Sequence, residues 1–161
     1  MVSRIMRSKY KNTSLANLEY RLRKFKDIVH DELFDIIRQK EEIIKNYVRQ
    51  QQLYRRGITG DGKRIWDTQP YAPRTIKNKR RKGQITTRVT LKDTGKFYDE
   101  FDIVITAEGF YITSHTEYSI YLEKRYGDNI YRLTDENLKR LLNVHIRPEL
   151  KKRLRKRLLY G

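Results

Sequence analysis

The sequence has no cysteine and only three prolines, and neither glycine nor proline occurs before Gly57. The absence of cysteine excludes disulfides, thiolate catalysis and cysteine-ligated metal sites. No stretch approaches the roughly 20 apolar residues that a membrane-spanning helix needs, and the first residues hold no apolar run of signal-peptide length. We therefore expect an intracellular protein without a membrane segment.

Apolar residues are also scarce, while positive charge is abundant. Hydrophobic residues make up 37% of the 161 positions, charged residues make up 35%, and the formal net charge is +17. A chain of this length can bury one ordinary core. Its like charges repel one another in the folded state, so we expect a partner that offsets them: a polyanion such as nucleic acid, an anionic membrane surface, or the acidic face of a neighbouring protein.

The first third of the chain has the apolar periodicity of a helix. The pattern runs from residue 15 to residue 54, Asn12, Thr13 and Ser14 offer an N-cap, and Gly57 follows as a stop. We assign residues 1–56 to a long N-terminal helix. At 1.5 Å per residue it would extend about 60 Å, more than the width of a domain this size, so it must kink or project. A projecting helix would need a partner chain.

Residues 57–92 form a loop-rich basic arm by composition. Asp61 and Gly62 suit a tight turn, and Pro73 suits the first turn of a short basic helix that Gly83 ends. Two strand-like runs follow between residues 102 and 114, and we expect a hairpin with its turn at Glu108 and Gly109.

Helices are expected in the rest of the body, which we assign to residues 93–161. One runs from a Thr116 cap to Gly127, a second starts at Thr134, and Pro148 interrupts before a final basic amphipathic helix. The predicted fold class is α+β, with a long N-terminal helix, a small antiparallel β-sheet and C-terminal helices in one domain.

No catalytic, cofactor or metal site is predicted. Gly57, Gly62 and Lys63 match part of a phosphate-binding loop, but Arg64 stands where a serine or threonine must hold magnesium. A metal-dependent nuclease would need converging carboxylates, and neither Asp99 with its neighbours nor Glu149 has that spacing. The three histidines are too widely spaced for a metal pair.

Two basic clusters are the strongest functional signal. Each is a run of lysine and arginine with almost no acidic residue: Arg74, Lys77, Lys79, Arg80, Arg81, Lys82 and Arg88 in the arm, and Lys151, Lys152, Arg153, Arg155, Lys156 and Arg157 near the end. Such clusters bind phosphates with little sequence preference. Solvated faces or docking surfaces for acidic subunits explain them equally well.

The stretch "VTLKDTGKFYDEF", the hairpin and "TEYSIYLEKRYG" resemble a motif order found in bacteriophage virion morphogenesis proteins of the tail-completion or neck class. The upstream glycine-rich and basic segment fits the same class, which includes proteins of phages that infect Bacteroides-like hosts and of crAss-like phages. The resemblance covers about residues 53–127. The matching positions are Leu91, Thr94, Gly95 and Phe97, with Phe101 trailing.

The resemblance implies a structural corner at those positions and no catalysis or cofactor. It implies a repeated, ring-forming subunit of the neck or head-tail connector, assembled in the host cytoplasm and located in the virion. Its partners would be its own copies and the portal, neck or tail proteins, with packaged DNA nearby. A free-standing nonspecific nucleic-acid-binding protein stays the alternative, and a metal-dependent nuclease a more distant one.

Overall fold

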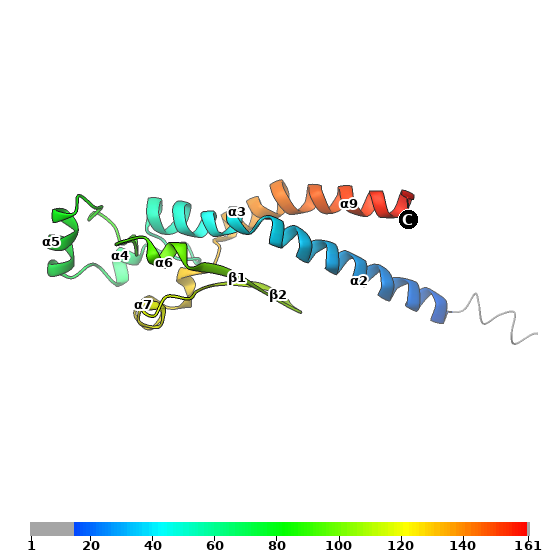
Figure 1. Ribbon diagram of the computed structural model, residues 1–161, viewed down its shortest axis with the longest axis horizontal. Helices are drawn as coiled ribbons and strands as arrows, with labels where there is room; N and C mark the ends of the chain where they lie inside the picture. The colour runs from blue at the N-terminus through cyan, green and yellow to red at the C-terminus, as the bar shows by residue number, and fades with distance from the viewer. Residues whose placement is uncertain (1–14, 161) are drawn as a thin grey trace, which may run out of the picture.

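The computed structural model describes residues 15–160, which form a helix-rich α+β fold with one two-stranded antiparallel sheet (Figure 1). The elements, in chain order, are α2 (Leu15–Gln39), α3 (Glu41–Asn46), the π-helix η2 (Tyr47–Arg56), α4 (Ile65–Thr68), α5 (Pro73–Arg81), α6 (Lys96–Asp99), β1 (Phe101–Thr106), β2 (Gly109–Ser114), α7 (Ser119–Tyr126), the 3-10 helix η3 (Asp128–Ile130), α8 (Asp135–Arg140), the π-helix η4 (Leu141–Ile146) and α9 (Arg147–Tyr160). The predicted fold class is confirmed.

The long N-terminal helix both kinks and projects. The break falls at Lys40, whose φ of −102° and ψ of 9° leave the helical region. Figure 1 shows α3 within the body and α2 leaving it at an angle. The cap predicted at residues 12–14 lies outside the described residues. The stop at Gly57 is confirmed, because this glycine caps η2 in the left-handed conformation with φ of 63°.

The hairpin has the predicted faces. Ile103 pairs with Ile112 and Ile105 with Phe110, so these four side chains share one face of the sheet. Because side chains alternate along a strand, Tyr111 and its cross-strand partner Val104 occupy the other face, and Tyr111 is exposed. The period-2 pattern of the sequence therefore assigned the core face correctly.

The predicted turn of the hairpin is wrong by one residue. Thr106 pairs with Gly109, so the turn consists of Ala107 and Glu108, and Gly109 is the first residue of β2. Gly109 has a positive φ of 152°, a conformation that L side chains rarely adopt, so glycine is favoured at this first position of β2. His30 of α2 lies against this turn, with its Nε2 3.2 Å from the carbonyl oxygen of Ala107.

The C-terminal helices form one continuous run, which contradicts the predicted interruption at Pro148. The run begins at Thr134, whose hydroxyl accepts a hydrogen bond from the Asn137 amide at 3.2 Å, as the predicted N-cap should. Pro148 is the second residue of α9, two positions after the end of the π-helix η4. A proline ring would collide with an α-helical carbonyl four residues back, and the wider π-helical turn carries the chain past that collision.

The basic arm has the predicted turn and helix. Ile58 and Arg64 form a β-bridge around the Asp61–Gly62 turn. Helix α5 starts at Pro73, as predicted. Helix α7, in contrast, starts at Ser119 rather than at a Thr116 cap, because the Thr116 side chain is buried near the Ser114 hydroxyl.

The core lies where the N-terminal and C-terminal helices meet the hairpin. It is built from buried side chains of α2, α3, η2, the corner before β1, β2, η3 and η4. Its fully buried members include Ile36, Ile44, Val48, Leu53, Phe97, Ile130 and Leu141. This core anchors α2 at its C-terminal end and leaves its N-terminal half outside.

Candidate interaction surfaces

The stretch that precedes β1 is a buried corner. Gly95 has a φ of 105° and is the N-cap of α6; Phe97 within α6 and Phe101 at the start of β1 are almost completely buried. Their rings meet edge to face with centroids 5.1 Å apart. The side chain of Thr94 accepts a hydrogen bond from the Lys96 amide at 3.3 Å. The residues from Thr94 to Phe101 thus turn the chain from the arm into the sheet.

The backbone just before this corner is strained, and hydrogen bonds hold it on both sides. Leu91 has a φ of 54°, which leucine rarely adopts. On its N-terminal side, the Tyr71 hydroxyl accepts from the Thr90 amide at 2.9 Å, and the Tyr98 hydroxyl donates to the Thr90 carbonyl. Burial raises the pKa of Tyr98 well above its usual range, so this phenol stays a donor. On the other side, Lys79 donates to the Lys92 carbonyl.

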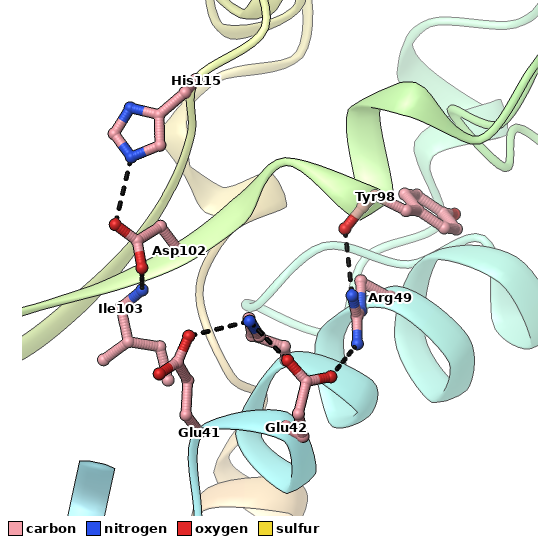
Figure 2. Close-up of polar contacts among 8 residues, drawn as sticks. Glu41, Glu42, Arg49, Tyr98, Asp102, Ile103 and His115 are labelled. Atoms are coloured by element: carbon pink, nitrogen blue, oxygen red, sulfur yellow. Dashed lines mark hydrogen bonds and ion pairs between the residues drawn. The ribbon is translucent and has the colours of Figure 1, made fainter.

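A polar cluster fixes the corner to the N-terminal helices (Figure 2). Arg49 donates to the Tyr98 carbonyl at 3.1 Å and to Glu42 at 2.8 Å. Lys45, which is largely buried, pairs with Glu41 at 2.8 Å and with Glu42 at 2.5 Å. The hydrogen bond from Lys45 lowers the pKa of Glu42 below its ordinary value.

A further polar contact in Figure 2 joins β1 to the residue that follows β2. His115 and Asp102 approach to 3.1 Å, and this contact lowers the pKa of Asp102. Asp102 also accepts from the Ile103 amide at 2.8 Å. The carboxylates of Glu41, Glu42 and Asp102 are therefore occupied in structural contacts.

Only part of the first basic cluster faces outward. Arg74, Lys77, Arg80 and Arg81 are exposed on α5 and have no ion-pair partner among residues 15–160. We call these four residues the α5 basic surface.

The other three residues of that cluster have structural contacts. Lys79 is 6% exposed and, besides the Lys92 carbonyl, donates to Gln84 at 3.0 Å. Lys82 pairs with Asp93 at 2.7 Å. Arg88 donates to the Tyr54 carbonyl at 2.8 Å. Lys79 is therefore unable to meet a partner at the surface, since its ammonium group is already desolvated and bonded.

The second basic cluster divides in the same way. Lys151, Lys152, Arg155 and Lys156 are exposed on α9, without an ion pair to any described residue, and we call them the α9 basic surface. Arg153 and Arg157 face α2 instead. Arg153 pairs with Glu32 at 3.2 Å and with Glu149 at 3.1 Å, and Arg157 pairs with Glu32 at 2.7 Å.

The structure does not bring the two basic surfaces together. In Figure 1, α5 lies at one end of the long axis, and α9 runs toward the other end. A single phosphate backbone would have to follow the length of the molecule to contact both. The two basic surfaces are therefore separate regions of the molecule.

The projecting half of α2 carries an apolar stripe, which we call the α2 seam: Leu15, Leu18, Leu22 and Phe25. Their exposed fractions run from 78% for Leu15 to 42% for Phe25. The spacing of three, four and three residues puts them on one side of the helix. The sequence showed this periodicity, but it did not show that the seam lies outside the core.

A groove of about 1130 Å³ lies between β2, η3 and α8, and the sequence gave no sign of it. Apolar side chains of the hairpin and of α8, including Phe110, Tyr111 and Leu138, line it. Its charged lining consists of four carboxylates, from Asp61, Asp128, Asp135 and Glu136, and two guanidinium groups, from Arg56 and Arg132. We call it the acidic groove.

The residues considered for catalysis are not gathered into a site. Glu149 pairs with Arg153, which lowers the pKa of its carboxyl, and Asp99 is exposed on the short helix α6. Lys63 of the partial phosphate-loop match pairs with Asp61 at 3.2 Å. Among residues 15–160, no group of three or more histidine, aspartate or glutamate side chains is arranged to hold a metal ion. No helix in that range is long and apolar enough to cross a membrane.

Comparisons with known proteins add no family assignment, since no family model, curated protein or solved structure matches the chain. The interaction surfaces described above are thus the basis for a functional hypothesis, together with the motif order of residues 53–127.

Proposed function

We propose that the chain is a structural virion protein of a tailed bacteriophage, a repeated subunit that forms a ring in the neck or head-tail connector. The order of the phage-like motifs supports this role. The corner built by Gly95, Phe97 and Phe101 supports it as well, since these residues are used in packing.

The exposed α2 seam is the observation that carries the proposal. A chain with a net charge of +17 places large apolar side chains in solvent on a helix that extends from its body. Contiguous exposed apolar surface of this kind marks a protein-protein contact. A subunit can bind a neighbouring subunit through an apolar stripe of this kind, because the stripe lies on a helix that projects from the body.

The two basic surfaces fit the same role. In a ring around a DNA channel, the α5 and α9 basic surfaces would face either the phosphates or acidic surfaces of portal, neck or tail proteins. Because the two surfaces lie apart on the long axis, one can contact DNA while the other contacts a protein. Both contacts weaken as salt screens the charges.

The mass of the purified full chain in solution tests this proposal. We expect light scattering to give a discrete multimer whose population grows with concentration, and electron microscopy to show closed rings. A chain that stays monomeric at every concentration, yet binds duplex DNA tightly at low salt, would overturn it.

That second outcome would favour a free-standing nucleic-acid-binding protein. The observation behind this second candidate is that eight lysines and arginines of the α5 and α9 basic surfaces are exposed, without ion pairs to the described residues. Such groups release counterions from nucleic acid without reading its sequence.

A further inference from the structure

We infer that the α2 seam of one copy docks into the acidic groove of the next copy. This inference rests on the proposed ring assembly and names the two surfaces that would build it. Helix-in-groove docking is a common recognition mode, in which an apolar helix face fills a hydrophobic groove on its partner.

The α2 seam has the form of such a docking helix. From Leu15 to Phe25 it extends about 16 Å at 1.5 Å per residue, which is three helical turns. All four of its side chains are exposed. Arg21 and Lys26 border the stripe on its two sides, and Arg23 and Lys24 lie on the opposite face of the helix.

The acidic groove has the form of a receptor for this helix. Tyr111 of β2 and Leu138 of α8 are 54% and 38% exposed within it, which leaves apolar surface for a partner to cover. The outer edge of β2 pairs with no other strand among residues 15–160. A helix laid along the groove would cover both the apolar lining and this open edge.

The charges of the two surfaces are complementary. The acidic groove is net negative in a strongly basic molecule, and Asp128 and Asp135 on its lining have no ion pair with any described residue. The segment from Leu15 to Asp27 is net positive, with four basic residues against two acidic ones. Complementary potentials favour this pairing over contacts between like surfaces.

The α2 helix of the same chain does not fill the groove. Arg153 and Arg157 hold its base through Glu32, and His30 lies against the hairpin turn. Figure 1 shows its free end at the opposite end of the molecule from α7. Because the two surfaces are different patches, their contact is head to tail, and head-to-tail contacts close into rings when the rotation between copies allows it.

A mixing experiment with two variants of the full chain tests the docking. Leu18→Glu with Leu22→Glu blocks the seam and leaves the groove intact. Tyr111→Glu with Leu138→Glu blocks the groove and leaves the seam intact. Each replaced side chain is exposed, so circular dichroism should show the wild-type fold.

We expect each variant alone to be monomeric in sedimentation equilibrium, and an equimolar mixture to form a 1:1 pair and nothing larger. One chain in the mixture keeps a seam and the other keeps a groove, so a single contact remains. Tyr20→Glu on the far face of α2 and Val144→Glu on η4 are matched controls, and they should assemble as the wild type does.

A charge reversal gives a second, independent readout. Arg21→Glu with Lys26→Glu should raise the dissociation constant by about tenfold or more, because these residues border the seam. Arg23→Glu with Lys24→Glu changes the net charge equally on the opposite face and should leave the constant within about threefold.

A mixture that stays monomeric, or a seam variant that assembles normally, would overturn the docking. If closed rings persist in both blocked variants, the docking fails and the ring-forming role stands. If the mixture pairs but wild-type chains never form closed rings, the docking stands and the ring-forming role fails.

Discussion

Arg153 shows how a single residue of a basic cluster can serve the fold. Its guanidinium group contacts Glu32, Asp35 and Glu149 and also donates to Gln39 at 2.7 Å. The hydrogen bonds, Asp35 first, raise its already high pKa, so the charge is permanent. Its side chain is 20% exposed and that of Glu32 only 12%.

Replacing Arg153 with methionine should therefore destabilise the protein, by about 2 kcal/mol in the free energy of unfolding, because Glu32 loses one of its two cations. Urea unfolding followed by circular dichroism measures this change. Arg155→Met on the exposed side of the same helix is the matched control and should change stability by less than about 0.5 kcal/mol. Equal losses in both variants would contradict the role of Arg153 as an anchor of α2.

Glu42 makes the stability of the folded protein depend on pH, and the direction of this dependence follows from its pKa. Its folded-state pKa lies below the ordinary value of 4.5, mainly because Lys45 donates to it. A depressed pKa contributes stability above pH 4.5 that is lost as the pH falls through the folded-state pKa. We expect the thermal midpoint to fall between pH 5 and pH 3 less steeply in Glu42→Gln than in the wild type. Identical slopes would mean that Glu42 is not held by Lys45 in solution.

At the scale of elements, the corner at residues 90–101 depends on a backbone that only glycine adopts easily. Gly95 has a φ of 105°, and it starts the single turn of α6 that delivers Phe97 to the core. Gly95→Ala should lower the free energy of unfolding by about 1 to 2 kcal/mol. Lys96→Ala, at the next and exposed position, should have little effect. Unfolding curves of the two variants, compared with the curve of the wild type, measure these changes in the free energy of unfolding.

Elements with local signals could be predicted from the sequence. Pro73 and Gly83 mark the ends of α5, Thr134 caps α8, and the alternating pattern of the hairpin gives its core face. The break at Lys40 has no such signal, because no glycine or proline stands there. The two π-helices also have no signal in the sequence. Because η4 could not be foreseen, Pro148 wrongly predicted that the helix is interrupted.

Of the candidate surfaces, the sequence could predict only the positive charge. Arg80 and Lys79 are neighbours in a basic run, yet the first is exposed and the second is buried. Tertiary contacts with Gln84 and the Lys92 carbonyl make that difference. The acidic groove is likewise assembled from residues between 56 and 138, which no local pattern links.

At the scale of the whole molecule, the proposed DNA contacts of the α5 and α9 basic surfaces should be independent of each other, since the two surfaces lie apart on the long axis. Changing the four residues of either surface to glutamine should lower the slope of log K against log salt by up to about 3.6, the value for four phosphate contacts. Changing both should abolish binding at physiological salt.

Fluorescence anisotropy with a labelled duplex at several salt concentrations measures these slopes. Lys124→Gln with Lys139→Gln is the control, because both residues are exposed and lie outside the two basic surfaces. Unchanged slopes after removal of both surfaces would show that they do not contact phosphates.

The contact between Glu32 and Arg153 also sets the order of events during synthesis. The two residues are 121 positions apart in the chain. At common rates of translation, roughly 6 to 24 seconds separate their addition to the nascent chain. Over that interval the base of α2 lacks Arg153 and Arg157, so the ion pairs that join α2 to α9 form only after α9 has been made. The native packing of this protein is therefore reached after translation of α9, and not progressively from the N-terminus.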